Sequence, residues 1–242
     1  MFKVKDKNLK IVGFYGQSGA GKTTVIRNVP DLVGGKSIIK NTGTIRYLFT
    51  KNPDSYRNPM EFISQKDAVM ADKNPGAQIA HIYERYIRSQ FQLMNDFSTE
   101  VFLSAREDYA VPSVMMFDRC PMDFNSITEC GMEQLRSEFG GKLNKIHSSF
   151  MALEKKAAIE NTVKFFDAIF IVKPWVAPDS KQSSTLKDGV RDQYLSEHYV
   201  DANWYSKLDG IDLGTTKVFV IDENVISIQD RVKFITSKLA EI

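Results

Sequence analysis

The chain has 242 residues, of which 43% are apolar, and this suits one α/β domain with a sizeable core rather than a disordered chain. Its 32 Lys and Arg and 30 Asp and Glu residues leave a net charge of +2, so affinity for nucleic acid would need a local basic patch. Two cysteines, Cys120 and Cys130, exclude a disulfide scaffold and a zinc site built on paired cysteines. The charged N-terminal stretch and the lack of a long apolar run predict a soluble, cytoplasmic protein with no membrane partner.

Apolar runs alternate with helical patterns along the chain. Buried strands are predicted at residues 10–15, 37–40, 113–117, 166–172 and 217–221. Helices are predicted at residues 23–29, 61–70, 78–97, 131–162, 192–208 and 226–239, with a break near Gly140 and Gly141. This alternation predicts an α/β fold of three layers, in which about five parallel strands lie between two layers of helices.

The stretch GQSGAGKT follows the first predicted strand and opens the first predicted helix. It fits the pattern G-x-x-x-x-G-K-[ST] at every position, in the context that this phosphate-binding loop requires. Glycines let the backbone aim its N–H groups at a phosphate, the helix start adds the positive end of its dipole, and Lys22 supplies a point charge. The Thr23 hydroxyl is a ligand for Mg²⁺. The residues predicted to bind the nucleotide are Gly16, Gln17, Ser18, Gly19, Ala20, Gly21, Lys22, Thr23 and Thr24.

A second candidate cluster follows the predicted strand at residues 113–117, where the apolar run ends in Asp118 and Arg119. Ligands of a parallel sheet bind at the carboxyl ends of its strands, so Asp118 is placed to hold Mg²⁺ or to take the acceptor's proton. Arg119 is suited to clamp a phosphate with two hydrogen bonds. The alternative is an ordinary Asp–Arg pair at a strand end.

The segment after the second predicted strand is the candidate acceptor site. Thr42, Thr44 and Arg46 lie there, and in a P-loop kinase fold this segment faces the acceptor. The alternative is structural, with Thr44 serving as the N-cap of a following helix.

The polar stretch at residues 174–208 is the lid candidate. Its Arg191 can neutralise charge on a transferred phosphoryl group once water is excluded, and the alternative is a solvated loop with ordinary charges. Trp175 and Trp204 flank this stretch, and packing is favoured over stacking on a nucleotide base.

Four segments, in order, resemble the P-loop kinases of the nicotinamide-riboside kinase and deoxynucleoside kinase type: GQSGAGKT, TGTIR, FDRCPMD and KDGVRD. The resemblance spans roughly residues 10–222 and implies one P-loop kinase domain over residues 1–242 that uses ATP or GTP with Mg²⁺. It implies phosphate and metal roles for Lys22, Thr23 and Asp118, and charge neutralisation by Arg119 and Arg191.

The chain departs from that family at one point. Related kinases often carry a carboxylate just after the second strand, whereas Asn41, Thr42 and Thr44 stand here. The base is then Asp118 or Asp123, or the acceptor is positioned without a strong base, which a loose transition state allows. Asp123 is therefore also a candidate for acceptor binding. A similar arrangement occurs in viral kinases that phosphorylate 5-hydroxymethyluracil within DNA, which would act in the host cytoplasm.

The sequence thus predicts an ATP-dependent kinase that transfers the γ-phosphate to a hydroxyl of a nucleoside, a nucleotide or a modified base in DNA. A free deoxynucleoside kinase or a nucleoside monophosphate kinase is the alternative within this class. A nucleotide-driven switch or motor and a nucleotide-binding protein without catalysis are the alternatives from other classes.

Overall fold

The computed structural model describes residues 8–17, 19–106, 109–141, 143–174, 204–225 and 227–242. Within these residues, six strands form one sheet in the order β2-β3-β4-β1-β5-β6. Their bounds are β1 (Leu9–Tyr15), β2 (Leu32–Val33), β3 (Lys36–Asn41), β4 (Ser113–Phe117), β5 (Ala168–Val172) and β6 (Lys217–Ile221). All neighbours pair in parallel except the two-residue β2, which runs antiparallel to β3. The α/β class and the five predicted strands are confirmed.

Eight α-helices and one 3₁₀ turn connect and flank these strands in the described residues. They are α1 (Lys22–Asn28), α2 (Thr44–Lys51), α3 (Pro59–Ile63), α4 (Lys66–Met70), α5 (Pro75–Ser104), α6 (Pro121–Phe139), α7 (Lys145–Phe165), η1 (Ser206–Leu208) and α9 (Ile228–Leu239). Within these residues, no helix combines the length and the hydrophobicity that a membrane crossing requires.

Two of the predicted helices differ from the observed ones. The predicted break near Gly140 and Gly141 is confirmed, since α6 and α7 are separate helices, but the first of them begins ten residues earlier than predicted, at Pro121. Proline at the first helical position and Asp123 in a capping box start α6 there, and Gly140, at a φ of 71°, ends it. The single helix predicted at 61–70 is likewise two short helices, α3 and α4.

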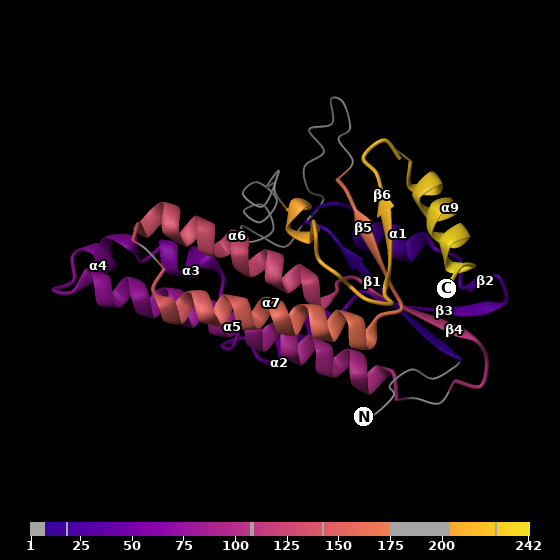
Figure 1. Ribbon diagram of the computed structural model, residues 1–242, viewed down its shortest axis with the longest axis horizontal. Coiled ribbons are helices and arrows are strands. Elements are labelled where there is room, and N and C mark those ends of the chain that lie inside the picture. The colour runs from indigo at the N-terminus through magenta and orange to yellow at the C-terminus, as the bar shows by residue number, and fades with distance from the viewer. Residues whose placement is uncertain (1–7, 18, 107–108, 142, 175–203, 226) are drawn as a thin grey trace.

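The two faces of the sheet are covered by different helices (Figure 1). Because side chains alternate along a strand, Val12 and Phe14 of β1 share a core with α1 and α9. Ile11 and Tyr15 of the same strand instead pack in the core that contains residues of α5, α6 and α7. The Phe14 ring stacks on the Phe170 ring of β5 with centroids 5.3 Å apart, which ties neighbouring strands together on the α1 face.

Helices α5, α6 and α7 run side by side and extend well beyond the sheet, with α3 and α4 against their far ends (Figure 1). At 30 residues, α5 is about 45 Å long, which is several times the length of a strand here. The close approach of α5 and α6 requires Gly131, because a Cβ there would overlap the Tyr86 hydroxyl, which donates to the Ile127 carbonyl at 3.0 Å. The apolar stripe predicted on residues 78–97 is therefore confirmed as core.

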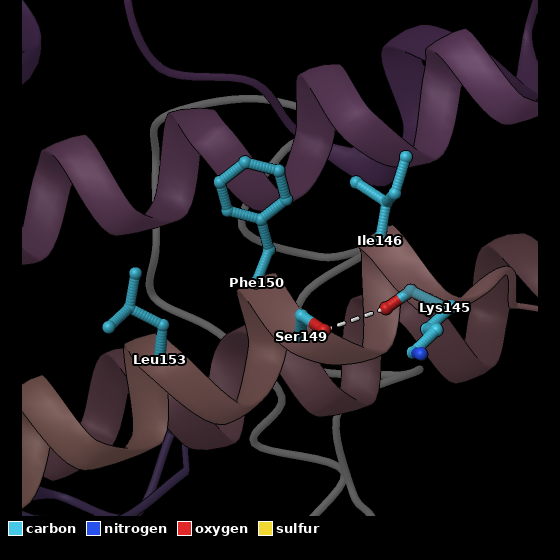
Figure 2. Close-up of a pocket in the computed structure, with 5 residues that line it drawn as sticks. All are labelled: Lys145, Ile146, Ser149, Phe150 and Leu153. Carbon is cyan, nitrogen blue, oxygen red and sulfur yellow. Dashed lines mark hydrogen bonds between the residues drawn. The ribbon is translucent and has the colours of Figure 1, made fainter.

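An open cavity of about 380 Å³ lies on the surface of α7 (Figure 2). Its lining residues are Lys145, Ile146, Ser149, Phe150 and Leu153. Ile146, Phe150 and Leu153 project from the same side of the helix, and the Ser149 hydroxyl donates to the Lys145 carbonyl at 2.9 Å (Figure 2). None of these residues belongs to the site predicted from the sequence.

Candidate nucleotide-binding site

The predicted phosphate loop lies at the centre of the sheet edge. Strand β1 sits between β4 and β5, and Gly13 of β1 is in register with Phe117 of β4. The loop that follows Tyr15 and the acid that follows Phe117 therefore emerge side by side, at the carboxyl ends of parallel strands. Two segments about a hundred residues apart in sequence are brought together by this register alone.

Two glycines shape the loop for physical reasons that no other residue would meet. A Cβ on Gly16 would lie 2.5 Å from the Val172 carbonyl oxygen of β5, so the backbones can approach this closely only without a side chain. Gly21 has a φ of 86° and precedes the first residue of α1. Its left-handed conformation turns the chain into the helix, whose N-terminal amides then face the loop. Ser18 lies outside the described residues.

Lys22 folds back over its own loop. Its Nζ donates to the Gly16 carbonyl at 2.5 Å and to the Gln17 carbonyl at 2.9 Å, and the residue is only 5% exposed. Burial, together with the nearby positive charge of Arg119, lowers the pKa of Lys22 to about 8. The nearby Asp123 and Asp118 oppose this lowering, and an anion in the loop would stabilise the charged form of Lys22 further.

Thr23 and Asp118 meet across the two segments. The Thr23 hydroxyl donates to Asp118 Oδ2, while Asp118 Oδ1 is buried with no hydrogen-bond partner among the described residues. Burial raises the pKa of Asp118, against the lowering effects of Lys22, Arg119 and the Thr23 hydrogen bond. A hydroxyl and a carboxylate with an unused oxygen are the hard donors that Mg²⁺ prefers. Across the described residues, no group of three His, Cys, Asp or Glu side chains offers an alternative metal site.

Arg119 and Asp123 lie directly beneath the loop. Arg119 Nη1 donates to the Gly16 carbonyl and to Asp123 Oδ1, both at 3.2 Å. Asp123 is fully buried, and its Oδ1 also accepts from the Gly16 N–H at 3.0 Å while its Oδ2 accepts from the Cys120 N–H at 3.0 Å. The structure thus places Asp123 as a support for the loop and as the side chain that accepts from the N-cap residue Cys120 in the capping box of α6. Its predicted contact with an acceptor stays a prediction.

The segment predicted to face the acceptor follows β3, which ends at the same sheet edge. The Asp118 N–H donates to the Asn41 carbonyl at 3.2 Å, so this segment adjoins the Asp118 strand end. Thr44 is the first residue of α2, and its hydroxyl donates to Asn41 Oδ1 at 2.6 Å. The cap of α2 is Gly43, so the alternative assignment of Thr44 as N-cap is wrong. Acceptor binding by Thr42, Thr44 and Arg46 stays a prediction.

Most of the lid candidate, including Arg191 and Trp175, lies outside the described residues. Trp204, at its far end, is 1% exposed and packs with its ring centroid 6.1 Å from that of Tyr15, so the packing interpretation is confirmed for it. The next residue, Tyr205, donates its hydroxyl to the Val172 carbonyl at 2.8 Å, beside Gly16.

One residue at the loop was missed by sequence reasoning. Arg231 of α9 is 3% exposed, and its Nη1 donates to the carbonyl oxygen of Ala20 within the loop at 3.2 Å. Nothing in the pattern of α9 separates this arginine from the helix's other basic residues. Its relation to the loop arises from the packing of α9 against α1.

Comparisons with known proteins bear on the fold. No protein-family model matches the chain, and no curated protein matches it significantly. Among solved structures, the chain is similar to the crystal structure of NadR protein in complex with NR, with a TM-score of 0.50 and 13% sequence identity. The similarity covers 97% of this chain and 51% of the NadR chain, so this chain spans about half the length of that protein. The comparison shows a shared α/β fold that extends over nearly all of this chain.

Proposed function

We propose that this chain is an ATP-dependent phosphotransferase of the three-layer P-loop kinase type, acting on a hydroxyl of a nucleoside-type acceptor. The observation that carries the proposal is the convergence of Lys22, Thr23, Asp118 and Arg119 at one edge of the parallel sheet. A P-loop by itself is compatible with many reactions. An acid and an arginine from the adjacent strand, both in contact with the loop, are the parts that phosphoryl transfer uses.

The loop supplies the phosphate site. Its backbone N–H groups and the start of α1 would surround the β- and γ-phosphates, and Lys22 would exchange its two carbonyl partners for phosphate oxygens. Arg119, with a 20% exposed side chain held by Asp123, is positioned to reach the transferred group. Fixed donors of this kind stabilise the charge that develops during transfer without having to reorganise.

Thr23 and Asp118 are the residues that would hold Mg²⁺, with phosphate and water oxygens completing its coordination. When bound, the ion would neutralise charge on the phosphate chain. The raised pKa of Asp118 fits this assignment, because a nearby cation would favour the charged carboxylate that burial disfavours.

The acceptor is proposed to lie beside Thr42, Thr44 and Arg46. The described residues 41–46 contain no carboxylate. Alignment of the acceptor hydroxyl would therefore contribute more to the rate of transfer than removal of its proton, as a loose transition state permits. NadR, which was crystallised in complex with NR, supports a nucleoside-type acceptor through the shared fold. The sequence resemblance extends this proposal to 5-hydroxymethyluracil in DNA, with Arg191 as the lid arginine.

The test is transfer of label from γ-labelled ATP to a panel of free nucleosides, nucleotides and DNA that contains 5-hydroxymethyluracil. We expect one class of acceptor to be labelled, and Lys22→Met to abolish the labelling. Lys233→Met, which removes a charge from an exposed position on α9, is the matched control and should retain activity. Equal labelling by wild type and Lys22→Met would refute the assignment. Hydrolysis without any labelled acceptor would favour a switch or motor ATPase instead.

A further inference from the structure

Arg231 links the phosphate loop to the segment that follows β6. Its Nε donates to the Val225 carbonyl at 2.8 Å, and its Nη1 donates to the Ala20 carbonyl at 3.2 Å. The planar guanidinium therefore holds two backbone segments that are about two hundred residues apart in sequence. The several N–H donors of a planar guanidinium have a fixed geometry that is suited to binding two carbonyls at once, whereas a lysine amine has no rigid second donor.

The charge of Arg231 has no carboxylate partner in the part of the chain that the structure describes. Among the described residues, no carboxylate forms an ion pair with it, and Nη2 is buried without a hydrogen-bond partner. Burial lowers the pKa of Arg231 accordingly. A buried cation with carbonyl partners alone is costly, and such groups are usually paired with an anion. The proposed phosphate loop contains Ala20, the residue whose carbonyl Arg231 contacts, so an anion bound there would lie near this charge.

The bond to Ala20 also sets the direction of a loop amide. A trans peptide is planar, with its C=O and its following N–H on opposite sides. When Arg231 holds the Ala20 carbonyl, the Gly21 N–H of the same peptide points the opposite way, away from the guanidinium. The left-handed backbone of Gly21 then carries the chain into α1.

From this geometry we infer that Arg231 is a positioning residue for the triphosphate chain: it orients the Ala20–Gly21 peptide and adds a fixed positive charge behind the loop. The inference rests on the proposed function, because it takes the ligand of the loop to be a nucleoside triphosphate. Arg231 acts on the phosphates through the peptide, and makes no contact with the base or with the acceptor.

The test uses the full chain and two probes, ATP and inorganic triphosphate, each with Mg²⁺. Arg231→Met should weaken binding of both probes in parallel by roughly tenfold or more, as expected when a hydrogen bond from a charged donor is lost. The KM for ATP should rise while the KM for the acceptor stays unchanged, a split that a general loss of structure would not produce. Lys233→Met, two residues away on the same helix and largely exposed, should behave as wild type.

The outcomes separate this inference from the proposed function. If wild type binds neither probe, both fail. If wild type binds ATP and Arg231→Met binds it equally well, only the role of Arg231 is overturned. Weakened ATP binding with unchanged triphosphate binding would also overturn it, because Arg231 would then read the base or the ribose. If circular dichroism shows that Arg231→Met does not fold, Arg231→Lys is tested by the same criteria. We then expect the binding of both probes to weaken several-fold.

Discussion

The support beneath the phosphate loop can be tested with one isosteric substitution, Asp123→Asn. The Asp123 carboxylate is fully buried and accepts from the Gly16 N–H, the Cys120 N–H and Arg119 Nη1 at 3.0 to 3.2 Å. Asparagine keeps the shape but replaces one acceptor oxygen with an NH₂ group. Whichever way the amide turns, that group faces an N–H donor, so at least one hydrogen bond becomes a repulsive contact.

The expected loss follows from the nature of these bonds. A hydrogen bond to a charged group contributes about 1.5–3 kcal/mol, and a buried donor left without a partner costs a comparable amount. The ion pair with Arg119 adds less than a fully buried pair would, because the Arg119 side chain is 20% exposed to solvent. We therefore expect Asp123→Asn to lower the free energy of unfolding by roughly 2–4 kcal/mol.

Urea denaturation followed by circular dichroism measures this difference. The matched control is Asp67→Asn, since Asp67 is also in the first turn of a helix, α4, but is exposed. The control should change the free energy of unfolding by less than about 1 kcal/mol, because a surface charge near a helix start is worth little. If the free energy of unfolding of Asp123→Asn also lies within about 1 kcal/mol of the wild-type value, the carboxylate does not hold the loop and the reasoning is refuted.

Three further outcomes are expected. Burial raises the pKa of Glu154 to about 8, so the folded chain retains a proton that the unfolded chain loses above about pH 4.5. The free energy of unfolding should therefore fall by ~1.4 kcal/mol per pH unit between these two values. Glu154→Gln should remove this slope when urea titrations are repeated at several pH values. With its pKa lowered to about 8, Lys22 loses its charge above that pH, so ATP affinity should decline there in wild type, whereas Lys22→Arg should show no such decline by calorimetry. Gly131→Ala should lower the melting temperature, because the added Cβ would overlap both the hydroxyl and the ring of Tyr86 and overpacking costs about 1–3 kcal/mol; an unchanged melting temperature would contradict the proposed clash.

The helix that follows Asp118 and Arg119 shows where local patterns can mislead. The stretch FDRCPMD was interpreted as a site motif, and a helix was predicted only from residue 131. The structure starts α6 at Pro121, because proline at the first position and Asp123 in the capping box are helix-start signals. Asp123 belongs both to the helix start and to the candidate site, since its carboxylate accepts from the Cys120 N–H in the capping box and from the Gly16 N–H in the loop. One side chain with two partners far apart in sequence cannot be assigned from either segment alone.

The sequence by itself determined the features that depend on neighbouring residues. Glycine spacing, an apolar run before the loop and a helical pattern after it predict that residues 16–23 are a phosphate loop, and five apolar runs located the strands. These features are local, because φ preferences, strand burial and helix starts depend on residues within a few positions of one another.

Only the tertiary structure decided which side chains meet. The bond from Thr23 to Asp118 spans 95 residues, that from Gly16 to Asp123 spans 107, and that from Arg231 to Ala20 spans 211. Such pairs depend on strand order and on which helix covers which face of the sheet. Neither of these can be predicted from the spacing of residues along the chain. The candidate site is therefore a local loop completed by four distant side chains, those of Asp118, Arg119, Asp123 and Arg231, and the sheet register and helix packing bring them to it.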